Sequence, residues 1–232
     1  MPIGTVIDHG KTVESSKNAE DLTRMYDEVA SKTKRMSVKP GDTIPIKGLK
    51  VEVLAAHGNA ISRKGNANAV CSGVEQKPED KTDNARSVGV SIAHGKFRML
   101  DLGDLTWNKE LELVCPENRI GKVDVYLTTH HGLDQSGPAA LVHAVSPKVA
   151  IMNNGEKKGG SPVAWKAVKS SPGLLDMWQL HYSAAGGAEN NVDEKMIANP
   201  QGQDPGHYLL LEAEADGKFK VTNSRNGFSK TY

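Results

Sequence analysis

The chain has 232 residues, enough to bury a substantial core as one large domain or two small ones. Its composition is that of a soluble globular protein, with 38% hydrophobic and 25% charged residues and a formal net charge of +1. This balance does not support nonspecific binding to nucleic acid or to an anionic membrane, and no apolar run is long enough to span a bilayer.

The two cysteines and the first residues bear on the cellular compartment. Cys71 and Cys115 are too few, and too far apart, to predict a zinc knuckle or a disulfide scaffold. Two buried free thiols are favoured over a disulfide, which would require export. The chain does not open with a basic segment and a long apolar stretch, so no signal peptide is visible. We therefore expect a cytoplasmic protein, or an exported one if a preceding segment carried a signal peptide.

The first part of the chain predicts strands, one helix and a long loop. PIGTVID predicts a short strand within residues 1–10, and the apolar spacing of residues 18–36 predicts a helix with Asn18 as its N-cap. Residues 38–56, VKPGDTIPIKGLKVEVLAA, predict two strands around Pro-Gly and Lys-Gly turns. Residues 57–87 are polar and predict a long loop, which in a compact domain is usually functional or mobile.

The remaining chain alternates strands with short helices. SVGVSIAHGKFRMLDL predicts a hairpin, residues 107–115 a helix, VDVYLTT a strand, GPAALVHAV a helix and SPKVAIMNNG a strand. SPVAWKAVKSSPG then predicts a helix capped by Ser161, and MWQLHYS a strand. Residues 184–206 predict an irregular connection before a closing hairpin that turns at Asp-Gly. This order of elements predicts an α/β or α+β fold.

Two of these strands end at a glycine beside a side chain that can bind a metal. MLDLGDL ends with Asp104, and LTTHHGLDQSG carries the adjacent pair His130 and His131. If the two strands are neighbours in one sheet, the carboxylate and the imidazoles emerge at the same edge. Zinc, manganese and iron accept this mixture of ligands. The alternative is that Asp104 is a turn carboxylate and His130 a packed core histidine.

These segments also carry a family resemblance. In order, LDLGDL, THHGLDQSG, a helix and PKVAIMNNG resemble the second half of a metallo-β-lactamase-fold hydrolase, and DNARS resembles an N-x-x-S motif of the same branch. That branch contains the C-terminal domain of the bacterial DNA-uptake-channel (competence) protein. The resemblance covers roughly residues 38–182. It implies a layered αββα sandwich, here one domain over residues 1–232, in which metal-activated water attacks an ester, phosphodiester or lactam-type bond.

The resemblance also implies the roles of individual residues. Asp104 corresponds to the metal-bridging carboxylate, and either His130 or His131 to the late histidine ligand, with Asp104 and His131 as the catalytic pair. The implied cofactor is a divalent metal, zinc or else manganese or iron. The residues that would frame the site are Asn84, Ser87 and Ser136.

The chain departs from the family in one important respect. The H-x-H-x-D-H segment that supplies most metal ligands is absent, which predicts a domain that is incomplete at its N-terminus. His9 and His57, both at predicted strand ends beside glycine, are the best substitutes, although a loop histidine exposed to water is the simpler interpretation of each.

This departure leaves two interpretations of the function. The first is a metal-dependent hydrolase with a small-molecule substrate, whose identity is set by loops on a shared scaffold. The second is a non-catalytic or weakly active remnant, without a metal, that acts as a binding or oligomerising module. Loss of outer strands would expose a sheet edge, so we expect a homo-oligomer.

Overall fold

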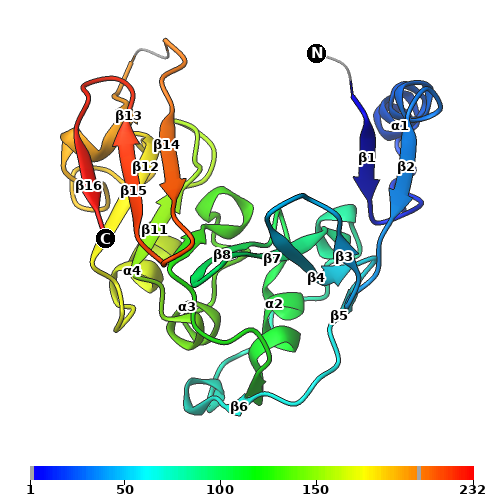
Figure 1. Ribbon diagram of the computed structural model, residues 1–232, viewed down its shortest axis with the longest axis horizontal. Helices are drawn as coiled ribbons and strands as arrows, with labels where there is room; N and C mark the ends of the chain where they lie inside the picture. The colour runs from blue at the N-terminus through cyan, green and yellow to red at the C-terminus, as the bar shows by residue number, and fades with distance from the viewer. Residues whose placement is uncertain (1–2, 203–204) are drawn as a thin grey trace.

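A nine-stranded sheet forms the centre of the computed structural model, which describes residues 3–202 and 205–232 (Figure 1). From one edge to the other, its strands are β13 (Ile197–Asn199), β12 (Asp176–His181), β11 (Val149–Met152), β10 (Val125–Leu127), β8 (Phe97–Asp101), β7 (Gly89–His94), β4 (Lys50–Ala56) and β3 (Thr43–Ile44), with β5 (Asn59–Ala60) paired to β4. The five strands from β13 to β8 are parallel, and β7, β4 and β3 extend the sheet in antiparallel fashion.

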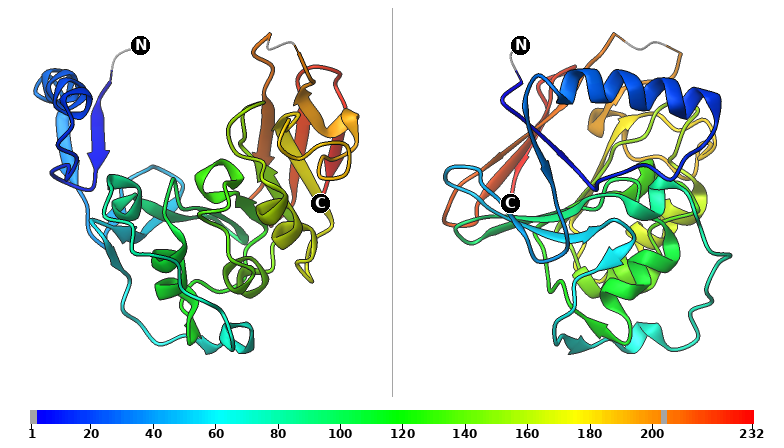
Figure 2. Two further views of the ribbon diagram at one scale, coloured as in Figure 1. Left: turned by 180° about the vertical axis from the view of Figure 1, so that it is seen from behind. Right: turned by 90° about the vertical axis from the view of Figure 1, so that its right-hand side faces the viewer.

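Both faces of the parallel part of the sheet are covered. The helices α2 (Trp107–Val114), α3 (Ala139–Val145) and α4 (Pro162–Lys169) cover one face and share its apolar core (Figure 2). A second sheet, formed by β14 (Leu209–Ala213), β15 (Phe219–Asn223) and β16 (Ser229–Thr231), covers the other. Because β11 is buried on both sides, its sequence is a continuous apolar run rather than an alternating one. The predicted mixed α/β architecture is confirmed.

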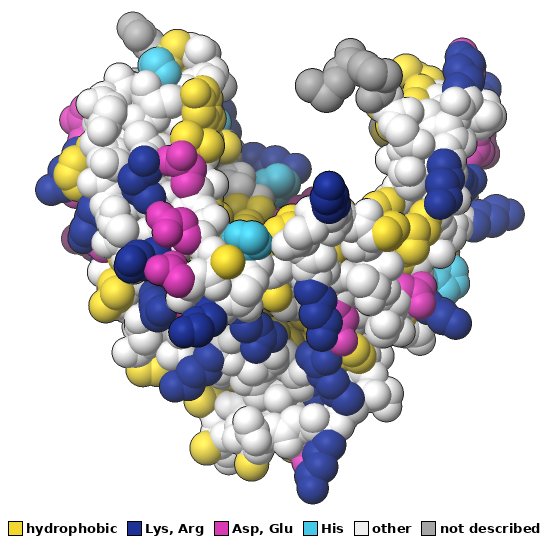
Figure 3. Space-filling view, viewed as in Figure 1, with side chains coloured by type: hydrophobic (Ala, Val, Ile, Leu, Met, Phe, Trp, Pro, Cys, Tyr) yellow, Lys and Arg dark blue, Asp and Glu magenta, His cyan; other side chains and the backbone are white. Residues whose placement is uncertain are grey.

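The N-terminal residues form an arm that projects from this body. The arm consists of β1 (Thr5–Asp8), parallel to β2 (Lys34–Ser37), and α1 (Lys17–Ala30), which lies beside them (Figure 1). Figure 3 shows a hollow between the arm and the C-terminal sheet. The predicted N-cap of α1 was wrong by two residues. Ser16 has the extended backbone that a cap needs and accepts a hydrogen bond from the N–H of Ala19, so Asn18 lies inside the helix.

The long segment 57–87 is largely irregular, as predicted, but short elements attach it to the body. These are β5, which pairs with β4; β6 (Asn66–Ala67), which pairs with β9 (Glu117–Asn118); and two 3-10 helices, η1 (Ala69–Cys71) and η2 (Asp83–Arg86). The Asn68 side chain donates hydrogen bonds to the carbonyl oxygens of Val114 and Ala140. The loop is therefore tied to the C-terminal end of α2 and to the start of α3.

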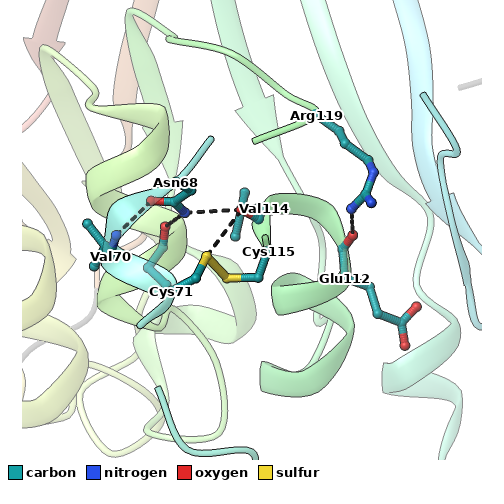
Figure 4. Close-up of a disulfide and its surroundings, with 8 residues drawn as sticks. Asn68, Val70, Cys71, Glu112, Val114, Cys115 and Arg119 are labelled. Atoms are coloured by element: carbon teal, nitrogen blue, oxygen red, sulfur yellow. Dashed lines mark hydrogen bonds between the residues drawn. A yellow bond between two sulfur atoms is a disulfide. The ribbon is translucent and has the colours of Figure 1, made fainter. Parts of the chain in front are cut away.

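The prediction of two free thiols was wrong. Cys71 in η1 and Cys115 at the end of α2 form a disulfide, with their Cα atoms 5.7 Å apart (Figure 4). Forty-four positions separate them in the sequence, and only the folding of the loop against α2 brings them together. Spacing alone carries no information about such a pair.

The predicted irregular connection at 184–206 was wrong in part. It contains the 3-10 helix η4 (Glu194–Met196) and the edge strand β13, whose three residues are buried beside β12. A strand of three residues has too short a pattern to be recognised without its partner. Residues 203–204 of this connection, and residues 1–2 of the predicted first strand, lie outside the described residues. Within the described ranges, no helix combines the length and apolar character needed to cross a membrane.

Candidate functional site

The candidate site lies where three neighbouring parallel strands end. Asp104 follows β8, His130 and His131 follow β10 in the 3-10 turn η3 (Thr129–Gly132), and Asn153 follows β11. The carboxyl ends of parallel strands are where ligands bind in open α/β sheets. The arrangement expected from the sequence, with Asp104 and the histidine pair at one edge, is the arrangement observed.

An unusual backbone holds the two histidines. His130 and His131 have φ values of 52° and 57°, in the left-handed region that residues with a Cβ rarely adopt. The N–H of His130 donates to the carbonyl of Gly103, which fixes this turn against the end of β8. Gly132 continues the turn with φ of 72°, and a Cβ there would lie 2.8 Å from the Met152 side chain. The turn therefore requires glycine directly after the pair.

His131 and Asp104 face each other. The His131 Nε2 atom lies 3.4 Å from Asp104 Oδ1, and both side chains are about one-third exposed. His131 Nδ1 lies 3.0 Å from the carbonyl oxygen of Asn153. Because a carbonyl only accepts hydrogen bonds, Nδ1 must carry a proton. In the neutral ring, Nε2 then has the free lone pair, and it faces the carboxylate.

His130 is held in a different way. The Ser136 hydroxyl donates to the carbonyl of Leu105, so it accepts from His130 Nδ1 at 3.3 Å. On the other side of the ring, His130 Nε2 faces the side-chain amide of Asn84 at 3.5 Å. Burial of the ring lowers the pKa of His130. Both ring nitrogens therefore have neighbours in the protein, and the ring is held in its neutral form.

Of the three residues expected to frame the site, two lie beside His130 and the third lies beside Gly103. Asn84 and Ser136 contact His130 from opposite sides, as described above. Ser87 lies against the backbone of Gly103, because a Cβ added at that glycine would be 3.5 Å from the Ser87 Cβ. Two of these residues therefore position a histidine, and the third packs under the segment that carries Asp104.

The donor set fits a divalent metal only in part. Two ligands of one tetrahedral zinc, each bonded at about 2.0–2.2 Å, are separated by about 3.4 Å. The distance between His131 Nε2 and Asp104 Oδ1 has this value. However, among the described residues no group of three or more His, Cys, Asp and Glu side chains converges. A catalytic zinc generally has three protein ligands, so the described residues do not form such a site by themselves.

His9 and His57 belong to a different cluster. Their rings are 6.5 Å apart at the junction of the arm and the body, and His9 Nε2 lies 3.9 Å from Asp83 Oδ1. The same carboxylate accepts hydrogen bonds from the Thr12 hydroxyl and the N–H of Val13. Asp83 is thus occupied in attaching the arm, and these residues do not complete a three-ligand group in the described chain.

Glu110, which the sequence interpretation did not consider, lies behind the histidine turn. It is fully buried on α2, and its Oε2 atom accepts a hydrogen bond from the N–H of Gly137 at 2.7 Å. Burial raises the pKa of its carboxyl to about 8, against the opposing effects of Thr129 and Gly137. Glu110 lies about one turn after Trp107 and one turn before Val114, on the apolar face of α2. A carboxyl at such a position in the sequence is the signal that could have identified it as buried.

Comparisons with known proteins leave the family of this chain open. No protein-family model and no curated protein matches it. Among solved structures, it is similar to a protein from Parabacteroides distasonis that is provisionally named a metal-dependent hydrolase. The two sequences are 15% identical, the match covers 75% of this chain and 74% of the other, and the TM-score is 0.38.

Proposed function

We propose that the chain is a hydrolase of the metallo-β-lactamase superfamily whose reaction centre is the pair Asp104 and His131. The observation that carries this proposal is the convergence of His131 Nε2 and Asp104 Oδ1 to 3.4 Å at the carboxyl ends of adjacent parallel strands. The carbonyl of Asn153 supports it, because it keeps the proton on Nδ1 and leaves Nε2 able to accept one.

The residues of this pair can activate water directly. A water molecule at the pair transfers a proton to His131 Nε2, and Asp104 stabilises the imidazolium that forms. The hydroxide attacks the acyl carbon of an ester, or the corresponding atom of a related bond, the bond to the leaving oxygen breaks, and the His131 imidazolium returns its proton to that oxygen, which restores the neutral ring. The charge of Lys158 contributes to lowering the pKa of His130, which makes this lysine a candidate to stabilise developing negative charge. Zinc, manganese or iron would need a further ligand beyond Asp104 and His131, so we assign no step to a metal.

The proposal is tested by hydrolysis of 4-nitrophenyl acetate and bis(4-nitrophenyl) phosphate. We expect Asp104→Asn and His131→Gln each to lower kcat/KM by at least about 100-fold, the usual contribution of a general base. His143→Gln is the matched control, because this histidine lies on α3 and its ring forms a hydrogen bond with the Ser170 hydroxyl. Activity that survives both site substitutions would refute the proposal. Metal content, measured by plasma mass spectrometry on the same samples, shows whether the pair retains an ion.

One observation favours the second function, an oligomerising module. Leu22, Met25 and Val29 are 57%, 58% and 44% exposed and lie at helical spacing on one side of α1. In the described arm, β1 and β2 each pair on one side only. A second copy of the chain, joined about a two-fold axis, would cover this apolar stripe with its own.

Light scattering coupled to size exclusion tests the module directly. We expect a dimer that becomes a monomer in Leu22→Asp/Met25→Asp. Leu175→Asp serves as the control, since that leucine is 65% exposed on the body. A wild-type monomer would exclude the oligomerising function and leave the hydrolase as the proposed function.

We also propose that the protein resides in an oxidising compartment, because its disulfide requires one. Alkylation of free thiols in cell extracts tests this, since the paired Cys71 and Cys115 would not react.

A further inference from the structure

A basic cleft lies at the other end of the sheet from Asp104 and His131. Its volume is about 660 Å³. The charged residues that line it are Lys50, Glu52, Arg63, Lys64, Arg98 and Arg119, of which Arg119 donates a hydrogen bond through its guanidinium to the carbonyl of Glu112 on α2. Five positive groups and one carboxylate give this cleft a formal charge of +4, although the whole chain carries only +1. Figure 3 shows Lys and Arg side chains gathered on the central part of one face of the molecule.

The sheet register brings two of these groups to the same face. Lys50 at the start of β4 pairs with Ala93 of β7, and Ala93 pairs with Arg98 near the start of β8. Directly paired residues project from the same side of a sheet, so the Lys50 and Arg98 side chains emerge together. Arg63 and Lys64 approach from the long loop. Glycine at position 121 leaves room for Arg98, since a Cβ there would lie 3.3 Å from the Arg98 guanidinium.

The arginines are fixed in place without using all their donors. Arg63 donates through Nε to the carbonyl of Arg119 and through Nη1 to Glu52, both at 3.0 Å or less. Arg98 donates through Nη2 to the carbonyl of Ile120 at 3.0 Å. A guanidinium has five N–H groups, so both keep donors for a ligand. The exposed side chains of Lys50 and Lys64 form no ion pair or hydrogen bond with any described residue.

We propose that this cleft binds a compact polyanion that carries two or more phosphate groups. The guanidinium group of arginine and the ammonium group of lysine both bind phosphate oxygens through charge-assisted hydrogen bonds. The volume is within the range of small-molecule sites. The described lining contains no aromatic side chain on which a base could stack, which disfavours single-stranded nucleic acid. Because the cleft shares no residue with the Asp104 site, this inference does not depend on the proposed hydrolase activity.

Calorimetric titration with sodium tripolyphosphate tests the cleft. We expect saturable binding of one tripolyphosphate per chain, weakened by added salt. Lys50→Gln/Lys64→Gln should weaken it by at least about tenfold, because each lost hydrogen bond to a charged group has a substantial cost. Both lysines are exposed, so the double variant should keep the wild-type melting temperature.

The matched control removes the same charge elsewhere. Lys17→Gln/Lys166→Gln changes one exposed lysine on α1 and one on α4, and we expect its affinity to stay within about twofold of the wild type, since distant surface charges are screened. Equal weakening in both double variants, or no saturable binding by the wild type, would overturn the proposal. Tighter binding of a single-stranded oligonucleotide than of tripolyphosphate would also overturn it, because the occupant would then be a nucleic acid.

Discussion

The arm and the body each contain a carboxyl group that is shielded from water, Asp8 in the arm and Glu110 in the body. Their pKa values are shifted in opposite directions. In the arm, Asp8 accepts hydrogen bonds from Tyr26, Ser37, Gly10 and Arg35. Burial acts to raise its pKa, but these four donors outweigh burial and lower the pKa to about 2. The charged carboxylate is thus the centre that joins β1, α1 and β2.

In the body, Glu110 is fully buried and accepts a hydrogen bond from the N–H of Gly137, and Thr129 also acts to lower its pKa. Its Oε1 atom has no hydrogen-bond partner among the described residues. Burial dominates, and the carboxyl is protonated at neutral pH because its pKa is about 8. The comparison shows that a partly buried carboxyl with four donors stays charged, whereas a fully buried carboxyl with fewer donors is neutral. It also shows that polar contacts hold the arm, whereas apolar packing and a disulfide hold the body.

The largest effect is expected from removing the disulfide of the body. Cys71→Ala/Cys115→Ala opens a loop of 44 residues, and the chain-entropy relation gives a loss of about 4 kcal/mol in the free energy of unfolding. Urea unfolding followed by tryptophan fluorescence measures it, because Trp107, Trp165 and Trp178 all lie in the body. Reduction of the wild type should produce the same loss. A change below about 1 kcal/mol would mean that the loop is held by its hydrogen bonds alone.

The next effect is a pH dependence caused by Glu110. Its pKa is raised from 4.5 to about 8 on folding, so the folded state binds the proton more tightly than the unfolded state. Stability is therefore full below about pH 4.5 and falls as the pH rises toward about 8, by an amount on the order of a few kcal/mol.

Glu110→Gln should remove this slope, since the amide does not titrate. The control Glu112→Gln, on the exposed side of the same helix and paired with Lys109, should keep it. Urea midpoints between pH 5 and pH 8.5 measure the slope in all three proteins. A wild-type midpoint that does not fall over this interval would show that Glu110 is not protonated in the folded protein.

The smallest effect is expected in the arm. Asp8→Asn removes the charge that Arg35 and Tyr26 contact, and a lost hydrogen bond of this kind costs about 1–3 kcal/mol. Hydrogen exchange of the α1 amides should accelerate while the tryptophan fluorescence of the body stays unchanged. Asp27→Asn is the control, since this exposed aspartate pairs with Arg35 only at 3.3 Å. Unchanged exchange in Asp8→Asn would show that the arm does not depend on this charge.

The wild-type arm should also respond to acid with the opposite sign from the body. The pKa of Asp8 is lowered from 3.8 to about 2, so the unfolded arm binds the proton more tightly. The stabilisation is present above about pH 3.8 and is lost as the pH falls toward about 2. Exchange of the α1 amides, corrected for the intrinsic rate at each pH, should therefore become faster in this interval. Stabilisation that persists at pH 2 would contradict the low pKa of Asp8.

Local signals were sufficient for most elements of the fold. Ser161 accepts a hydrogen bond from the N–H of Ala164 as the sequence predicted, because an N-cap depends on its own helix alone. The hairpin of β7 and β8 turns at Gly95 for the same reason. In contrast, β13 has only three residues and becomes recognisable through its pairing with β12. The disulfide likewise depends on a loop that local pattern does not fold.

The sequence by itself determined that Asp104 and the histidine pair follow two strands, because alternating and β-branched residues before a glycine define where each strand ends. Only the tertiary structure decided that these strands are neighbours and parallel, which brings His131 to within 3.4 Å of Asp104. It also distinguished the two histidines. Ser136 and Asn84 occupy both nitrogens of His130, whereas Asn153 leaves Nε2 of His131 free to face the carboxylate. Such contacts join residues far apart in the chain, and no local pattern specifies them.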